Sequence, residues 1–139
     1  MAEVGKVLRA ATQTAMGAAL VGTGVGHLTT LRREFRAQVP SWFPADPDLV
    51  VVVSGVAEVG LGAALLVTWP QPARAVVGAA TAAFFVAIFP GNVAQFLEHK
   101  DGFGLDTDAK RLARLPFQAV LVAGALYGTD AIRTWRSRR

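Results

Sequence analysis

The sequence has no cysteine and, among its 139 residues, only two histidines, His27 and His99. Without cysteine the chain can form no disulfide, no thiol nucleophile and no cysteine-ligated cluster. A metal site would need several carboxylates to converge on a histidine from separate segments, and no spacing predicts this. No nucleophile stands beside a base in a catalytic arrangement. We therefore expect no metal site and no enzyme that acts on its own.

Charge is also scarce, at 17% of the residues against 53% hydrophobic, and it is absent from long stretches. Residues 10–31 and 75–97 contain no charged side chain, and residues 49–73 contain one, Glu58. About 20 apolar residues form a helix that crosses a hydrocarbon core of roughly 30 Å. A soluble bundle would need charged helix faces, which the second and third stretches lack. The sequence thus predicts an all-α fold, an integral membrane four-helix antiparallel bundle.

The four spans are expected within a single membrane domain that covers residues 1–139. They are predicted at residues 10–31, 49–69, 75–97 and 112–132, with long loops at 32–48 and 98–111. The last span reaches sufficient length only by continuing past Asp130. The short connection after Trp69 predicts that the second and third spans are antiparallel neighbours.

The basic residues that produce the net charge of +4 cluster at the ends of the spans. Lipid headgroups explain them there, so the charge does not indicate nucleic-acid binding. Lysine and arginine divide equally between the two sides of the membrane, seven to each, which leaves the orientation open by count. The C-terminal segment RTWRSRR contains four arginines and no acid. It favours a multi-pass protein of the cell membrane with both termini in the cytoplasm.

Small residues recur at four-residue spacing in the first span, at Ala18, Gly22 and Gly26. Such a stripe lets two helix backbones approach closely in a membrane, where lipid supplies no hydrophobic drive for association. We expect this face to pack on a neighbouring helix, either in the same chain or in another membrane protein, and a homo-oligomer is one such arrangement.

Polar residues of the spans gather in one half of the bundle. Glu58 lies near the middle of its span, where a charge costs roughly 2.5–3.5 kcal/mol, so it should face protein rather than lipid. Ser54 precedes Glu58 by four residues and shares its helix face. The rise of about 1.5 Å per residue places the others toward the long-loop end. The predicted cluster comprises His27, Ser54, Glu58, Asn92, Arg114 and Gln118.

This cluster has two interpretations. It forms a site that opens toward the long loops and binds a polar headgroup, such as a quinone ring or a small anion, while Glu58 or His27 passes protons. Alternatively, its members hold the helices together by hydrogen bonds worth about 0.6 kcal/mol each. A difference in depth of about 10 Å argues against a direct pair of His27 and Glu58, and Arg114 can reach downward more easily.

Five segments of the chain resemble the DoxX-like family of small four-span membrane proteins, namely GVGHL, VPSWFP, LVVVVSGVAEVGLGAALL, FPGN and RLPFQ. The similarity extends from Gly17 to Tyr127, although the family usually has alanine at the position of Gly91. DoxX is named as a membrane subunit of a thiosulfate:quinone oxidoreductase, and its relatives look like accessory partners of redox enzymes. The matching positions coincide with the predicted polar cluster.

The resemblance implies an accessory or quinone-proximal subunit of a membrane redox assembly. We expect no intrinsic cofactor, quinone as the candidate ligand, and the lipid bilayer and a redox enzyme as partners. One alternative is a structural or assembly partner of another membrane protein, with no ligand chemistry of its own. A small-solute transporter is a further alternative, which the absence of an inverted repeat in the sequence disfavours.

Overall fold

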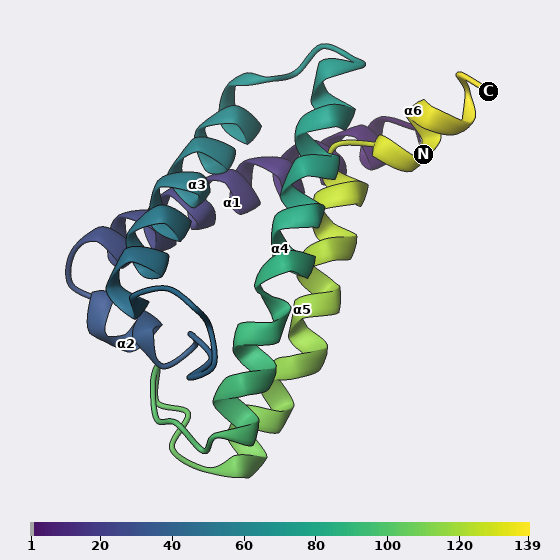
Figure 1. Ribbon diagram of the computed structural model, residues 1–139. Coiled ribbons are helices and arrows are strands. Elements are labelled where there is room, and N and C mark those ends of the chain that lie inside the picture. The colour runs from purple at the N-terminus through teal and green to yellow at the C-terminus, as the bar shows by residue number, and fades with distance from the viewer. Residues whose placement is uncertain (1) are drawn as a thin grey trace.

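The computed structural model describes residues 2–139, and this part of the chain is all-α, as predicted (Figure 1). Two of its helices, α2 and α6, are short, and the other four have the length of a membrane span. The helices are α1 (Ala2–Leu28), α2 (Arg32–Arg36), α3 (Pro47–Val67), α4 (Ala73–Leu97), α5 (Asp108–Gly128) and α6 (Ala131–Arg136).

Side-chain caps define where α3 and α5 begin. Asp46 precedes α3, and its carboxylate accepts a hydrogen bond of 2.8 Å from the backbone N–H of Asp48. Pro47 follows as the first helical residue, where its missing N–H costs nothing. The hydroxyl of Thr107 accepts from the N–H of Lys110 in the same way at the start of α5. Each long loop therefore ends in a capping residue that starts the next helix through a contact with a residue two or three positions away.

The last predicted span, 112–132, is not a single helix. The helix α5 begins at Asp108 and ends at Gly128, and α6 begins at Ala131. Between them Asp130 adopts a left-handed backbone conformation, with φ of 56°. A residue in this conformation cannot continue a right-handed helix, so the chain changes direction before Ile132.

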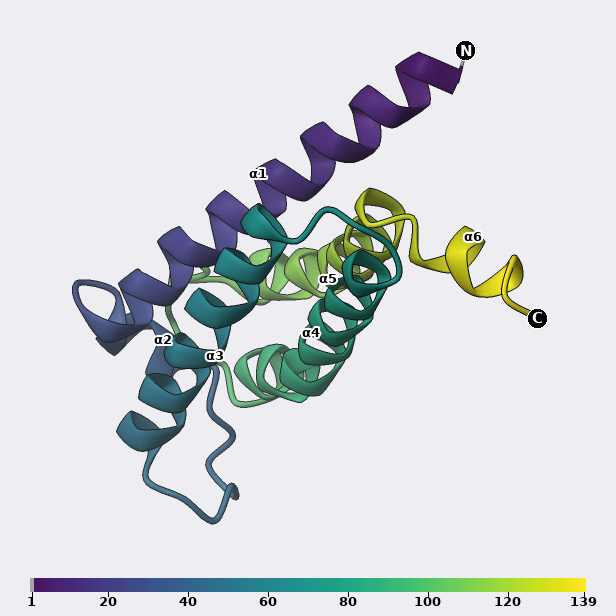
Figure 2. The ribbon, with the colours of Figure 1, turned by 90° about the horizontal axis from the view of Figure 1, so that it is seen from above.

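The long helices pack in two pairs. The helix α3 packs chiefly on α1 and α4 chiefly on α5, while α3 and α4 contact each other much less. In the view of Figure 1 α3 and α4 diverge from the connection between them, and Figure 2 shows α1 against α3 and α5 beside α4. The short connection makes α3 and α4 antiparallel neighbours, as predicted, although each of them packs more extensively on another helix. Close packing depends on which helix faces are complementary, and these faces lie on α1 and α5.

Glycines bring α1 and α3 together. A Cβ atom added to Gly17 would lie 2.9 Å from the carbonyl oxygen of Gly62, and one added to Gly24 would lie 2.9 Å from that of Gly55. No side chain larger than hydrogen fits at these crossing points. The contact inside the chain therefore uses glycines seven residues apart, which is two helical turns on each helix.

The predicted stripe of small residues lies elsewhere on α1. Ala18 and Gly22 are exposed, and a Cβ atom on Gly22 would meet nothing within 4 Å. Gly26 is buried, but its nearest neighbour is Leu31 in the turn that follows the same helix. The prediction is therefore wrong for packing inside the chain. Adjacent positions such as Gly17 and Ala18 point about 100° apart around the helix axis, so the face that packs on α3 is not the face that carries the predicted stripe.

A half-buried arginine and a buried glutamine join all four long helices near the α3–α4 connection. Arg74 of α4 donates from Nε to Oε1 of Gln13 in α1 (2.6 Å) and from a terminal nitrogen to the carbonyl of Gly128 in α5 (2.8 Å). The amide of Gln13 donates in turn to the carbonyl of Leu65 in α3 (2.7 Å). These bonds hold the two helix pairs together at one end of the bundle.

Within the described residues, α3 and α4 are long and apolar enough to cross a membrane. Both also expose large aliphatic side chains on their outer faces, as a surface in contact with lipid does. These side chains include Val56, Val67, Val76 and Val86. The fold therefore favours a membrane location for at least this part of the chain.

Candidate functional site

A cavity of about 900 Å³ separates the α1–α3 pair from the α4–α5 pair at the end of the bundle that carries the long loops. The segment between α2 and α3 covers one side of it, where the exposed Trp42 and Phe43 contribute to the lining. Most of the wall is apolar. Five residues of the predicted polar cluster line this cavity: His27, Ser54, Glu58, Arg114 and Gln118.

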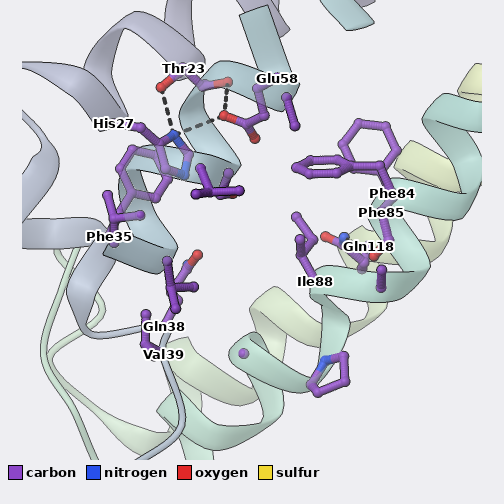
Figure 3. A pocket seen from close by; sticks show the side chains of 18 of the residues that line it. Thr23, His27, Phe35, Gln38, Val39, Glu58, Phe84, Phe85, Ile88 and Gln118 are labelled. Atoms are coloured by element: carbon purple, nitrogen blue, oxygen red, sulfur yellow. Dashed lines mark hydrogen bonds and ion pairs between the residues drawn. The ribbon is translucent and has the colours of Figure 1, made fainter. Parts of the chain in front are cut away.

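A histidine and a carboxylate form a direct pair on the α1–α3 wall (Figure 3). Nδ1 of His27 lies 2.8 Å from Oε2 of Glu58, and both residues are only 5% exposed. The same nitrogen lies 2.8 Å from the backbone carbonyl of Thr23. The hydroxyl of Thr23 donates to Oε2 of Glu58 at 3.3 Å. The carboxylate, the imidazole and the threonine thus make one compact hydrogen-bonded group.

The position of one proton follows from these contacts. The carbonyl of Thr23 can only accept a hydrogen bond, so Nδ1 of His27 must carry a hydrogen. The other ring nitrogen, Nε2, lies on the cavity side of the ring in Figure 3. In the neutral imidazole Nε2 is therefore an acceptor and a base that faces the cavity. Glu58 keeps the ring in this orientation and can stabilise the imidazolium that forms when Nε2 takes a proton.

The expectation that depth separates His27 from Glu58 is wrong. The Cβ atom of His27 lies beside Gly55, one turn from Glu58 on the same helix. Seven residues of α3 precede Ser54, so α3 extends well beyond the level at which α1 ends. Depths counted from the edges of apolar stretches assume that the two helices begin at one plane. The glycine contacts between α1 and α3 shift the two helices along each other, and this shift brings His27 to the level of Glu58.

Aromatic residues from two loops enclose the histidine. The ring of Phe35 in α2 stacks on the ring of His27, and the ring of Phe103 packs edge-on against Phe35 with centroids 4.6 Å apart. Thr23, Phe35 and Phe103 were not among the predicted site residues. Thr23 precedes His27 by four residues and shares its helix face, which is a signal that the sequence contains. Phe35 lies in the short helix α2 and Phe103 in the loop before α5, and the periodicity of the long helices does not predict either position.

The α5 wall carries the second polar group of the cavity. The amide nitrogen of Gln118 donates to the carbonyl of Phe85 in α4 at 2.6 Å. Its oxygen accepts at 3.1 Å from a terminal nitrogen of Arg114. The guanidinium of Arg114 also lies over the ring of Phe117, 5.3 Å from its centroid. Arg114 thus pairs with Gln118 and not with Glu58.

The two remaining members of the predicted cluster differ in position. Ser54 lines the cavity one turn from Glu58, where the sequence places it. Asn92 is buried, with 3% exposure, but it does not line the cavity. Its side-chain oxygen has no hydrogen-bond partner among residues 2–139. The structure therefore groups five of the six predicted residues around one space and separates Asn92 from it.

The loop between α4 and α5 is attached to the opposite loop by polar contacts. Lys100 donates from Nζ to the carbonyl of Val39 at 2.8 Å, and the N–H of Phe103 donates to Glu34 at 2.8 Å. The buried Arg111 supports the loop from α5 by binding the carboxylates of Asp101 and Asp108. These contacts hold Phe103 against Phe35, and hence Phe35 against the histidine.

The arrangement is suited to a ligand with an apolar body and a polar head. The apolar wall can hold the body, while Nε2 of His27 and the guanidinium of Arg114 offer polar contacts to the head. Within the described part of the chain, no group of three or more histidine, aspartate or glutamate residues could hold a metal ion. The polar groups that line the cavity can supply hydrogen bonding, charge stabilisation and proton transfer at His27.

Comparison with known proteins gives one match. A family model described as "Domain of unknown function (DUF8561)" matches residues 16–128, a range that contains both walls of the cavity. No curated protein and no solved structure matches the chain.

Proposed function

The chain belongs to the family described as "Domain of unknown function (DUF8561)", a description that assigns no activity, and we propose its function from the cavity. The protein is an integral membrane subunit that binds a quinone-like lipophile by its headgroup and serves a membrane redox assembly as an accessory partner. The observation that carries this proposal is the pair of His27 and Glu58, which faces an otherwise apolar cavity. A buried ionisable pair of this kind in a membrane helix bundle is typical of a ligand or proton site.

In this proposal α1, α3, α4 and α5 all cross the bilayer as a four-helix antiparallel bundle. The apolar length of α3 and α4 supports it directly. The helices α1 and α5 pair with them and expose large apolar residues of their own, such as Val25 and Val120. The ends of the chain and the α3–α4 connection then share one side, which we assign to the cytoplasm of the cell from the arginines of residues 133–139.

The proposed ligand follows from the shape and chemistry of the cavity. A quinone has a planar ring with two oxygen atoms and an apolar tail, which matches an apolar wall with few polar contacts. Nε2 of His27 can accept a proton from a quinol hydroxyl, and Glu58 stabilises the resulting charge. Oxidation of the quinol releases two protons and two electrons. His27 takes one proton, and the second proton and both electrons pass to the partner oxidoreductase, so the chain itself supplies binding and transfer of one proton.

The resemblance to the DoxX-like family supports the same proposal. Of the six positions that match that family, five line the cavity. Residues that only pinned helices together would not need to face a common space. The grouping therefore favours the binding interpretation over the helix-pairing interpretation for His27 and Glu58.

Titration of the purified protein with a short-chain quinone tests the proposal. Because Trp42 lines the cavity, its fluorescence should be quenched saturably as the quinone binds. We expect His27→Ala and Glu58→Gln to weaken binding by about tenfold or more, the equivalent of one lost hydrogen bond to a charged group. His99→Ala is the matched control, because this exposed histidine lies outside the cavity. Absence of saturable quenching, together with no copurifying oxidoreductase, would reject the proposal.

A second candidate function is that of an assembly partner for another membrane protein. The exposed Ala18 and Gly22 on α1 favour it, since they leave a flat face open to a second helix. Gly22→Leu should then abolish copurification of the partner while Glu58→Gln preserves it. Gly5→Leu on the same helix is the control, because a Cβ atom on Gly5 would also meet nothing within 4 Å, but Arg9 and not a small residue follows it four positions later. The opposite pattern, with loss in Glu58→Gln only, would reject this candidate.

A further inference from the structure

We infer that the cavity binds an amphiphile whose headgroup carries an ionised oxygen, and that the guanidinium of Arg114 holds this oxygen. The inference rests on the proposed function, because it concerns the same cavity. It goes further by naming the charge of the ligand and the residue that selects it.

The first observation is a missing partner on Arg114. Its terminal nitrogen Nη1 is buried and has no hydrogen-bond partner among residues 2–139, although the residue lines the cavity. A guanidinium is planar and offers several N–H donors in a fixed geometry. Leaving one of them buried and unpaired destabilises the protein, and the cost is greater for a charged group than for a neutral one. An acceptor from a ligand in the cavity would remove this cost.

The second observation is a missing countercharge. Within the part of the chain that the structure describes, no carboxylate lies within ion-pair distance of Arg114. Glu58 is the acid on the facing wall, and it is already paired with His27. A charge inside a membrane bundle is normally paired with another group. Here the pairing charge has to come from outside the chain, and the cavity is where it can enter.

The third observation is that Arg114 is held in place. Nη2 donates to Oε1 of Gln118, and Gln118 is itself fixed by its bond to the carbonyl of Phe85. The ring of Phe117 lies against the guanidinium. A guanidinium that is oriented in this way loses little freedom when it binds, and it favours an oxyanion through charge-assisted hydrogen bonds. The guanidinium of Arg114 is therefore already oriented for binding before a ligand enters the cavity.

The ligand class follows from these points. The head carries an ionised oxygen that accepts from Arg114, and the body is apolar. A carboxylate, a phosphate ester or the ionised hydroxyl of a hydroxyquinone has this chemistry, whereas a neutral quinone has only carbonyl oxygens. The oxyanion can belong to a free amphiphile or to the phosphate of a bilayer lipid, and the experiment below separates the two sources.

A matched pair of ligands tests the charge requirement in the full-length protein in phosphatidylcholine nanodiscs. The pair is a 2-hydroxy-3-alkyl-1,4-naphthoquinone, which is ionised at neutral pH, and its uncharged 2-methoxy ether. We expect the ionised compound to bind about tenfold more tightly, since a charge-assisted hydrogen bond exceeds a neutral one by about 1.4 kcal/mol. Arg114→Gln should remove this preference, while His27→Ala should weaken both compounds and keep their ratio.

Controls separate loss of recognition from loss of fold. Arg33→Gln removes a positive charge on the same side of the protein but outside the cavity, and it should keep the preference. Arg114→Lys retains the positive charge, so it should keep part of the preference for the ionised compound. If the two compounds bind equally to the unmodified protein, or if Arg114→Gln keeps the ratio, the inference is wrong although the proposed function stands. If neither compound binds, both the inference and the proposed function are wrong.

Adding phosphatidylglycerol to the nanodiscs identifies the source of the oxyanion. If this lipid competes with the ionised compound in the unmodified protein and not in Arg114→Gln, a lipid phosphate is the natural partner of Arg114. If it does not compete while the preference depends on Arg114, the partner is a free acidic amphiphile. Both outcomes support the inference, because in each of them Arg114 binds an ionised oxygen in the cavity.

Discussion

The hydrogen on Nδ1 of His27 determines what the cavity can do. Two acceptors, the carbonyl of Thr23 and the carboxylate of Glu58, lie 2.8 Å from this nitrogen and keep the hydrogen there. Nε2 is then available to the ligand as a base. A histidine without the carboxylate could turn or change tautomer, and a carboxylate without the histidine would be an unpaired buried charge. The two residues therefore work as one unit.

A double-mutant cycle should show this coupling. His27→Leu leaves the carboxylate of Glu58 buried without its partner, and we expect the free energy of unfolding to fall by about 3 kcal/mol or more. The double variant His27→Leu with Glu58→Leu removes both polar groups, so it should recover most of this loss. Reversible unfolding of the detergent-solubilised protein measures both changes. Additive losses in the double variant would contradict the coupling.

At the scale of secondary-structure elements, the approach of α1 to α3 creates the site. Gly55 lies directly against His27, so the glycine contact and the polar pair belong to the same crossing point. A helix pair held further apart would leave the imidazole short of the carboxylate. The geometry of the candidate site therefore depends directly on the close packing of α1 against α3.

Gly55→Ala should weaken this crossing. The added Cβ atom would lie 2.6 Å from the Cβ atom of His27, a distance that forces the two helices apart. We expect a loss of about 1–3 kcal/mol in unfolding free energy, as for other overpacked positions, together with weaker ligand binding. Gly60→Ala on the same helix is the control. Its Cβ atom would meet nothing within 4 Å, so higher helix propensity should leave the protein equally or more stable.

The loops that enclose His27 should loosen in acid. Hydrogen bonding from Ser41, with a contribution from Lys100, lowers the pKa of Glu98 below its usual value of 4.5. A carboxylate whose pKa is lowered in the folded state stabilises that state above its unfolded pKa, and this contribution is lost as the pH falls through the folded pKa. The contact between Glu98 and the N–H of Ser41 is therefore present at neutral pH and lost in acid.

Hydrogen exchange can measure this change. The protection factor of the Ser41 amide should decrease as the pH falls below 4.5, because protonated Glu98 is a weaker acceptor. Glu98→Gln should give a low and pH-independent protection factor. Thr107 caps α5 without a titrating group, so protection of the Lys110 amide serves as an internal reference. Equal acid sensitivity in Glu98→Gln would show that another group is responsible.

The whole molecule has one closed end and one open end. Arg74 and Gln13 join the helix pairs near the α3–α4 connection, and the cavity separates the pairs at the long-loop end. In the proposed four-span arrangement the cavity opens toward one face of the bilayer. The absence of cysteine makes this arrangement convenient to test, since a single introduced thiol can be labelled without background.

Labelling with a membrane-impermeant maleimide should distinguish four spans from two. Thr30 and Ser137 are both exposed, one in the turn after α1 and the other after α6. With four spans Thr30→Cys and Ser137→Cys lie on opposite sides of the membrane, so only one of them should react before permeabilisation. If only α3 and α4 crossed, both sites would lie on the same side and react together. The second result would overturn the four-span proposal.

Helix content and the approximate position of the polar residues could be predicted because their signals are local. Long uncharged runs, the proline at position 47 and the cap at Thr107 act within a few residues of the helices they define. The 1.5 Å rise per residue was enough to place His27, Ser54, Glu58, Arg114 and Gln118 toward one end. The end of α5 before Asp130 was not predicted, because the neighbouring residues do not specify a left-handed backbone conformation at this position.

The sequence by itself therefore determined the α-helical class, the apolar stretches and the residues with chemistry to offer. Only the tertiary structure decided which of them meet. The pairing of α1 with α3 depends on glycines that allow close approach, and it brought His27 to Glu58, left Arg114 with Gln118 and moved Asn92 away from the cavity. Register between helices is set by contacts far apart in the chain, so it has no signal within any one helix.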